Sequence, residues 1–215
     1  MITKYKFDRK ISNVIHDKDS SPCNIGLNIT EPVIIRISKF TEDSVKNFTN
    51  DMDRAYTTNQ KIIPIICDSY GGQVYSLMAM IDIINKARIP VATIIEGKAM
   101  SCGAILAACG TKGHRYMGEN ATIMIHDVSS GSIGKVSEIQ ASAKEAERLN
   151  KLVFRILDER CGKKENYIWD KLQDTGRADW FLTSKMAKKH GLIDHIGIPD
   201  MNVQVKVKYS LSLEK

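Results

Sequence analysis

The sequence predicts an α/β fold built on a mainly parallel β-sheet, and three observations support this prediction. Short runs rich in β-branched residues predict strands at 33–37, 62–67, 91–95 and 121–125. Segments with apolar residues at helical spacing, or with many small residues, predict helices between them at 41–56, 74–86 and 101–109. Strands that alternate with helices are joined by crossover connections, so these strands are expected to run parallel.

The first predicted helices each carry a local signal. Thr41 is a residue type that favours a helix N-cap, and Phe48 and Met52 recur on one face of the helix that follows it. The segment 74–86 is mostly apolar, which predicts a buried helix. The segment 101–109 is rich in glycine and alanine, which allows close approach to neighbouring elements.

A long amphipathic helix is predicted over 137–160, with an apolar stripe that continues for several turns. Ser137 with Gln140 resembles a capping box at its start. A short helix is predicted over 183–190.

The two ends of the chain differ in pattern. Residues 1–30 show no period and are predicted to form an irregular N-terminal arm, ahead of one domain over 31–215. Near the C-terminus, apolar and polar residues alternate over 203–213, which predicts a half-buried strand.

The composition is typical of a soluble globular protein, with 43% hydrophobic and 26% charged residues. The formal net charge is +6, but basic residues are scattered among acidic ones, which argues against nucleic-acid binding. The five cysteines show no CxxC spacing, so no disulfide framework, zinc site or other cofactor is expected. No segment resembles a signal peptide or spans a bilayer, so a cytoplasmic protein without membrane partners is expected.

Two turns contain groups that could stabilise an oxyanion. After the second predicted strand, the chain reads Asp68-Ser69-Tyr70-Gly71-Gly72, and paired glycines leave backbone N–H groups exposed. Ser101 lies where the third predicted strand turns into a helix. A helix N-terminus has free N–H groups and partial positive charge, which favour a nucleophile there, although the position also suits a plain N-cap serine.

His126 stands at the carboxyl end of the fourth predicted strand, where ligand sites gather in parallel α/β folds. A serine nucleophile needs a base, and the base usually needs an orienting carboxylate. Asp127 is a poor candidate, because neighbouring strand residues point to opposite faces. Asp170, Asp174 and Asp179 are the better candidates, and the residues alone do not decide among them.

Together these segments resemble the Clp protease proteolytic subunit, a family of serine peptidases with a crotonase-like fold of repeated ββα units and a protruding handle helix. DSYGGQV is similar to that family's NSPGG segment, GKAMSCGAIL to its GxAASMGAxL turn and ATIMIHD to its RxMIHQP segment. The spacing also agrees, because Gly72 precedes Ser101 by 29 residues and Ser101 precedes His126 by 25. Tyr70 replaces the family's proline, and Asp127-Val128 replaces its Gln-Pro pair.

The resemblance implies a role for each matching residue. Ser101 would be the nucleophile, His126 the general base and Asp179 the third member of the triad. The backbone N–H groups of Gly72 and Cys102 would form the oxyanion hole. An extended segment beside the bound peptide would consist of Gly131, Ser132, Ile133 and Gly134, and it would pair with the substrate backbone.

The resemblance also implies an assembly. It predicts a serine endopeptidase that cleaves unfolded polypeptides inside a homo-oligomer of stacked heptameric rings, with an AAA+ unfoldase as an expected partner. The handle, over about 127–162, would contribute to the contact between rings.

Three other interpretations are compatible with parts of the sequence. A crotonase-type enzyme acting on acyl-CoA would also use oxyanion-hole glycines, but it has no need for a serine and a histidine at this spacing. A Ser–Lys peptidase would use Lys98 or Lys112 as the base. An inactive, ring-forming scaffold would keep the fold without a working triad.

Overall fold

The computed structural model describes residues 31–176 and 179–203. Val33–Ile198 form one compact unit, which carries every helix and strand described below. The predicted arm at 1–30 and nearly all of the predicted strand at 203–213 lie outside the described residues.

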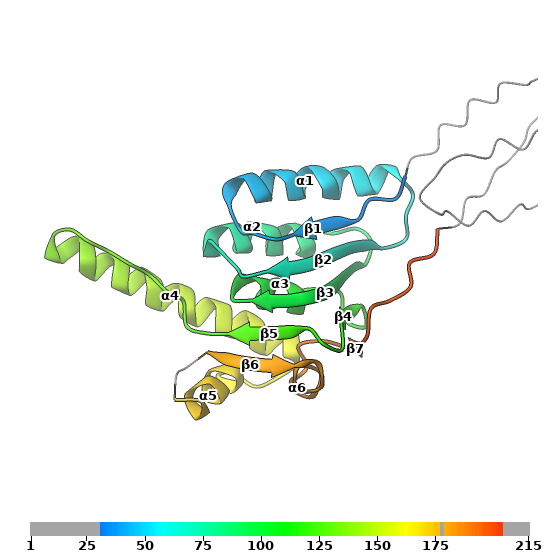
Figure 1. Cartoon of the computed structure of the whole chain (residues 1–215). Helices are drawn as coiled ribbons and strands as arrows, with labels where there is room; N and C mark the ends of the chain where they lie inside the picture. The colour runs from blue at the N-terminus through cyan, green and yellow to red at the C-terminus, as the bar shows by residue number, and fades with distance from the viewer. Residues whose placement is uncertain (1–30, 177–178, 204–215) are drawn as a thin grey trace, which may run out of the picture. The chain divides into compact units, whose positions relative to one another are not determined.

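The described elements alternate between strands and helices through most of the chain (Figure 1). The strands are β1 (Ile35–Ile37), β2 (Ile63–Ser69), β3 (Val91–Met100), β4 (Arg115–Met117), β5 (Thr122–Ile125), β6 (Trp180–Thr183) and β7 (His195–Ile196). The helices are α1 (Glu42–Thr57), α2 (Val74–Asn85), α3 (Cys102–Ala108), α4 (Val136–Cys161), α5 (Tyr167–Asp174) and α6 (Ser184–His190).

One sheet contains all seven described strands, in the order β1-β2-β3-β4-β7, with β5 beside β3 and β6 beside β5. Every pairing is parallel except that of β5 with β6. The predicted α/β fold with a mainly parallel sheet is therefore confirmed. The long strand β3 pairs with β4 through Thr93–Ile95 and with β5 through Lys98–Met100, so the carboxyl ends of β3 and β5 lie side by side.

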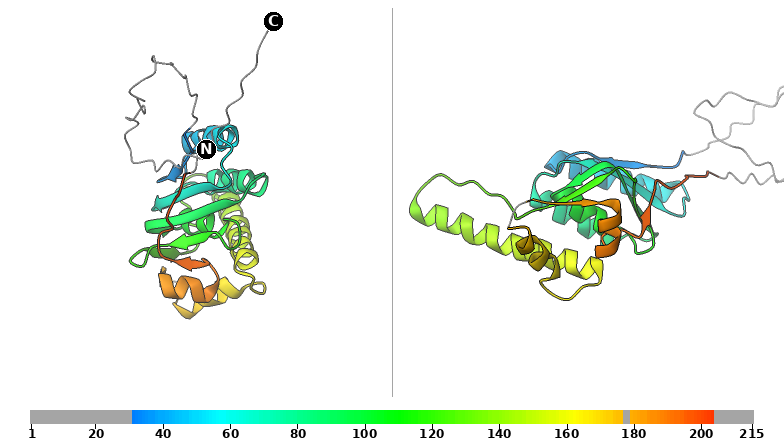
Figure 2. Two further views of the ribbon diagram at one scale, coloured as in Figure 1. Left: turned by 90° about the vertical axis from the view of Figure 1, so that its right-hand side faces the viewer. Right: turned by 60° about the horizontal axis from the view of Figure 1, so that its bottom comes forward.

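Helices α1, α2 and α3 cover one face of the sheet and bury the main core against it (Figure 2). Thr41 caps α1 as predicted: its hydroxyl accepts the Ser44 N–H, and the Ser44 hydroxyl accepts the Thr41 N–H in return. The largest fully buried side chains are Phe40, Phe48, Ile35, Met52, Ile63, Ile65, Leu77, Met80, Ile94, Ile95, Leu106 and Met117.

Helix α4 packs its C-terminal half on the body through Leu149, Val153 and Leu157, while its N-terminal half extends away from the sheet (Figures 1 and 2). The predicted capping box of Ser137 with Gln140 is wrong. The helix begins one residue earlier, and the Lys135 N–H donates to the Glu138 carboxylate at 3.0 Å. Within the described residues, none of the helices has the length and apolar character that a membrane span requires.

Candidate active site

The predicted site residues meet at one edge of the sheet. Strand β3 lies between β2 and β5, and the three strands run parallel, so their carboxyl ends adjoin. Ser101 follows β3, the Gly71-Gly72 turn follows β2, and His126 follows β5. This edge is where parallel α/β sheets place ligand sites, because the loops that leave the strands converge there.

Ser101 occupies a backbone conformation that L-residues rarely adopt, with φ 54° and ψ −121°. Its N–H donates to the Met124 carbonyl of β5 at 2.9 Å, and its carbonyl accepts the N–H groups of Ala104 and Ile105 in α3. The predicted N-cap position is confirmed, but the hydroxyl makes no side-chain capping bond to the helix. The Ser101 hydroxyl is therefore not used to cap α3.

The glycine turn packs directly on Ser101. A Cβ at Gly71 would lie 2.8 Å from Ser101 Cβ, and one at Gly72 would lie 2.5 Å from the Phe40 carbonyl oxygen. Both glycines also have positive φ, at 106° and 151°. Side chains at these two positions are excluded by close approach as well as by backbone conformation.

Ser69, which the sequence did not single out, fixes this turn. It is fully buried, its hydroxyl donates to the Ser38 carbonyl at 2.9 Å, and it accepts the Gly71 N–H at 3.0 Å. The Gln73 N–H donates to the Phe40 carbonyl at 2.9 Å. The segment before α1 thus holds the glycine turn at both ends. A polar residue beside paired glycines was the only signal for this role in the sequence.

Two backbone donors belong to residues that lie beside Ser101. Within the described residues, neither the Gly72 N–H nor the Cys102 N–H donates to a backbone carbonyl. Cys102 is the first residue of α3, where helical N–H groups lack an intrahelical acceptor. Both residues line the same pocket as Ser101 and His126. This arrangement can stabilise negative charge on an oxygen atom bound beside Ser101.

The Cys102 thiol is not a competing nucleophile. Its Sγ lies 3.3 Å from the Gly72 carbonyl oxygen, and the side chain is buried. Burial raises the pKa of this thiol, so it stays protonated near neutral pH and lacks thiolate character.

His126 and Asp179 lie within ion-pair distance, with His126 Nδ1 3.8 Å from Asp179 Oδ1. The separation exceeds that of a normal hydrogen bond, and about half of the Asp179 side chain is exposed. Among the described residues, the Ser101 hydroxyl and the His126 ring share a pocket without a hydrogen bond between them. Hydrogen bonds in active sites without substrate are often long and shorten when substrate binds.

Asp174, which the sequence left open, and Asp127, which it disfavoured, have different partners. Asp174 pairs with Lys171 at 2.8 Å on the exposed side of α5. Asp127 lines the same pocket as His126, and its carboxylate accepts a hydrogen bond from the Asn150 amide at 3.3 Å. Of these residues, Asp179 is the one that the fold brings to the histidine.

The pocket has both polar and apolar lining residues. Besides Gly72 and Cys102, its polar lining consists of Ser101, His126, Asp127 and Ser129. Its apolar lining consists of Val74, Ile105, Ile125, Val128, Val153, Phe154 and Leu157. The predicted peptide-binding residues Gly131, Ser132, Ile133 and Gly134 are exposed in the loop between β5 and α4.

Neither lysine of the Ser–Lys alternative is suited to act as a base. Lys98 Nζ lies 2.7 Å from Asp68 Oδ1 and 4.4 Å from the centre of the Tyr70 ring. The hydrogen bond to Asp68 raises the pKa of Lys98, which keeps the amine protonated. Lys112 precedes β4 and therefore lies at the amino ends of the parallel strands, opposite Ser101.

The comparison with known families agrees with this geometry. A family model described as Clp protease matches residues 55–200, which is more than half of the chain. The chain belongs to the Clp protease family. The segment that matches the Clp protease family contains Gly72, Ser101, His126 and Asp179, so all four fall inside the shared domain. Membership of the Clp protease family indicates a peptidase.

Proposed function

We propose that this protein is a serine endopeptidase that hydrolyses peptide bonds of unfolded polypeptides. The observation that carries the proposal is the conformation of Ser101. A non-glycine residue with positive φ at a strand-to-helix turn costs about 1–3 kcal/mol, and such strain gathers at functional sites. Here the strained residue carries a hydroxyl that does not cap α3, and it lines a pocket together with His126, Gly72 and Cys102.

In this proposal, Ser101 Oγ attacks the carbonyl carbon of the substrate while His126 accepts the hydroxyl proton. The Gly72 and Cys102 N–H groups stabilise the oxyanion of the tetrahedral intermediate. His126 then donates the proton to the leaving amine, which yields an acyl-enzyme on Ser101. Water, deprotonated by His126, hydrolyses the ester and restores the serine. Asp179 orients the imidazole and stabilises its charged form.

The loop at 131–134 offers a binding mode for substrates of many sequences. Its residues are exposed and belong to no described helix or strand, so their backbone groups are accessible to a peptide. A peptide that pairs with this backbone would be held mainly by main-chain hydrogen bonds, which do not depend on its sequence.

We also propose that the active form is a homo-oligomer of stacked heptameric rings, with an AAA+ unfoldase as a partner that supplies unfolded chains. A site that binds peptides mainly through their backbone would accept many sequences, and enclosing it inside a chamber would keep folded proteins away from it. The family resemblance is the basis of this proposal, and the exposed apolar side chains at the start of α4 support a contact between copies of the chain.

The deciding experiment is covalent labelling with a fluorophosphonate probe, with mass spectrometry to locate the adduct. The expected result is an adduct on Ser101 that is absent in Ser101→Ala, together with loss of fluorogenic-peptide hydrolysis in that variant. Assembled wild-type protein that takes no label and cleaves no peptide would overturn the proposal. Rings that take no fluorophosphonate label and hydrolyse no peptide would indicate a scaffold. Binding of acyl-CoA without labelling of Ser101 would indicate a crotonase-type enzyme.

A further inference from the structure

The chain that follows His126 is held by one side chain of the long helix. The Val128 N–H donates to Asn150 Oδ1 at 2.9 Å, and Asn150 Nδ2 donates to Asp127 Oδ1 at 3.3 Å. Asn150 therefore contacts both residues immediately beyond the histidine. It lies 23 and 22 residues away from them in sequence, so these are tertiary contacts between the loop and α4.

The two partners determine how the Asn150 amide is oriented. The Val128 N–H can only donate, and an ionised carboxylate at Asp127 can only accept. An amide supplies one oxygen acceptor and two N–H donors, so only one orientation satisfies both partners. Leucine, which has a similar shape, would make neither bond, and aspartate would keep the acceptor but lose the donor.

Asn150 is itself held in place. It lies in the half of α4 that packs on the body, where its neighbour Leu149 and the nearby Val153 are buried. The hydrogen bonds of the Asn150 side chain therefore hold Asp127 and Val128 at a fixed place relative to α4. By contrast, the pairing of β5 with β3 extends no further along the chain than Met124, and its pairing with β6 no further than Ile125.

His126 is thus the first residue beyond the strand ladder and the last before the Asn150 contacts. Its contact with Asp179 is 3.8 Å long, and more than a quarter of its side chain is exposed. The pairing of β5 with its neighbouring strands ends before this residue. Hydrogen bonds on the next two residues restrict the backbone that carries the imidazole.

We propose that Asn150 is a positioning residue. It holds His126, and the start of the loop that leads to residues 131–134, in their reactive arrangement. This inference rests on the proposed peptidase function. It also accounts for two departures from the family pattern: Val128 in place of proline provides the N–H that Asn150 accepts, and Asp127 in place of glutamine provides a carboxylate that accepts its amide.

The test is a reciprocal exchange at 127 and 150, measured by hydrolysis of a fluorogenic peptide with leucine before the scissile bond. Asn150→Leu and Asn150→Asp should each lower kcat about 10- to 100-fold, because small displacements of a reacting group have effects of this size. In Asn150→Asp the new carboxylate would also repel the carboxylate of Asp127. Asp127→Asn combined with Asn150→Asp restores a donor and an acceptor, and most of the activity should return. Lys151→Ala, on the exposed side of α4, is the matched control and should retain wild-type kcat.

A second measurement keeps the inference testable without activity. Hydrogen exchange of the peptide that covers 127–135 should accelerate in Asn150→Leu, because the Val128 N–H loses its acceptor. Wild-type kcat and unchanged exchange in Asn150→Leu, or a double variant as inactive as Asn150→Asp alone, would overturn the inference. Failure of the proposed function would look different, since wild-type protein would then lack Ser101-dependent labelling and hydrolysis altogether.

Discussion

At the scale of single residues, the strain at Ser101 is held by its surroundings. The N–H bond to Met124 fixes one side of the residue, and α3, buried along its whole length, fixes the other. Gly71 packs directly against the Ser101 side chain and leaves no room there for a side chain of its own. The folded protein maintains this conformation because the surrounding contacts are worth more than the strain costs.

Replacing Ser101 by glycine should therefore separate stability from activity. Ser101→Gly should be more stable than Ser101→Ala by about 1 kcal/mol, because glycine adopts positive φ without strain and this gain exceeds its entropic cost. Both variants should lack peptidase activity. Thermal melting of the two variants at equal protein concentration measures the difference. Equal melting temperatures would show that the turn is not strained.

The third member of the proposed triad can be decided at the same scale. Asp179→Asn should lower kcat strongly, because the amide would favour the wrong His126 tautomer and would not stabilise the charged imidazole. Asp174→Asn removes only an exposed pair with Lys171 and should leave peptide hydrolysis unchanged. Steady-state kinetics of both variants tests the assignment, and loss of activity in Asp174→Asn alone would reverse it.

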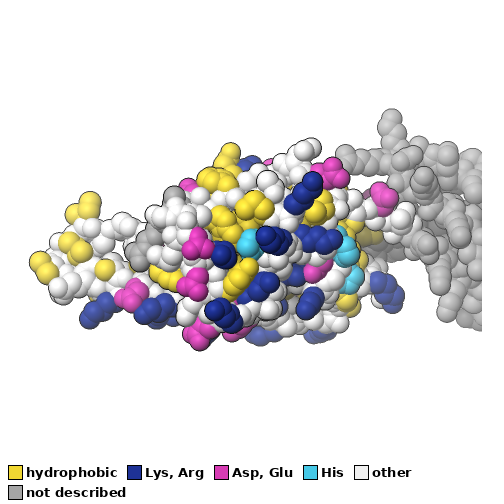
Figure 3. Space-filling view, turned by 90° about the horizontal axis from the view of Figure 1, so that it is seen from below, with side chains coloured by type: hydrophobic (Ala, Val, Ile, Leu, Met, Phe, Trp, Pro, Cys, Tyr) yellow, Lys and Arg dark blue, Asp and Glu magenta, His cyan; other side chains and the backbone are white. Residues whose placement is uncertain are grey.

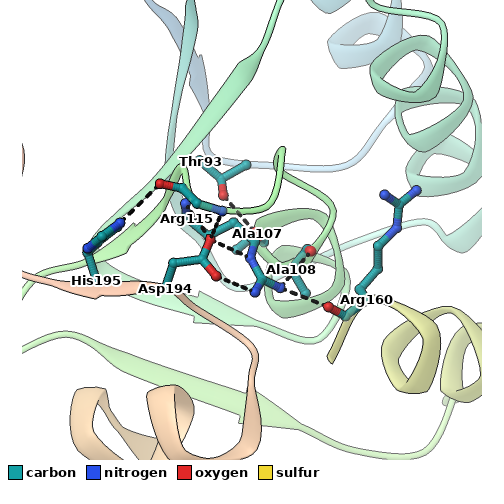
Figure 4. Close-up of polar contacts among 8 residues, drawn as sticks. Thr93, Ala107, Ala108, Arg115, Arg160, Asp194 and His195 are labelled. Carbon is teal, nitrogen blue, oxygen red and sulfur yellow. Dashed lines mark hydrogen bonds and ion pairs between the residues drawn. The ribbon is translucent and has the colours of Figure 1, made fainter. Parts of the chain in front are cut away.

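At the scale of elements, one buried guanidinium joins several parts of the fold (Figure 4). Arg115, at the start of β4, binds both carboxylate oxygens of Asp194, which precedes β7, at 2.9 and 2.6 Å. It also donates to the Arg160 carbonyl near the end of α4 and to the Ala108 carbonyl at the end of α3. Carbonyls at helix C-termini favour a cation, so the pair is well satisfied despite its burial.

Breaking this pair should destabilise the fold more than breaking a surface pair. Asp194→Asn should lower the free energy of unfolding by about 3 kcal/mol, because it leaves a buried charge without its counter-ion. Glu147→Gln removes an exposed pair with Lys151 on α4 and serves as the control, with no measurable effect expected. Chemical denaturation of both variants gives the comparison, and equal stabilities would contradict the role of the buried pair.

The same pair should make stability depend on pH at the acid end. Burial opposes the ionisation of Asp194, but hydrogen bonds and charge from Arg115 outweigh it and lower the pKa of the carboxyl group. A carboxyl group with a lowered folded-state pKa contributes stability above its unfolded pKa of about 4, and this contribution is lost as the pH falls further. The stability difference between wild type and Asp194→Asn should therefore shrink below about pH 4.

The elements that the sequence did not predict are short or depend on distant partners. Strands β4 and β7 have three and two residues, too few for a period to appear. Strand β6 was not predicted, and its antiparallel pairing with β5 depends on a contact between segments more than 50 residues apart. In the site, spacing and resemblance predicted Ser101, His126 and both glycines. The contact of Ser69 with Ser38 and the contacts of Asn150 join segments far apart in the chain, so the sequence pattern does not reveal them.

At the scale of the whole molecule, the exposed end of α4 is the feature that a single chain leaves unexplained. Apolar side chains gather at this end (Figure 3). Ile133 is fully exposed, and Val136 and Ile139 are 72% and 43% exposed. Clustered apolar groups on a protruding helix are typical of a surface that is covered by a partner. In the proposed assembly that partner is a second copy of the same helix, in the opposite ring.

Substitutions that introduce charge at the exposed end of α4 should therefore separate the two rings. The double variant Val136→Glu and Ile139→Glu should halve the mass of the assembled particle, since burying two unpaired carboxylates between rings is unfavourable. Native mass spectrometry gives the particle mass directly. Met186→Glu places a charge on a similarly exposed apolar residue of α6 and should leave the mass unchanged. A double variant that keeps the wild-type mass would show that the rings do not meet through this end of α4.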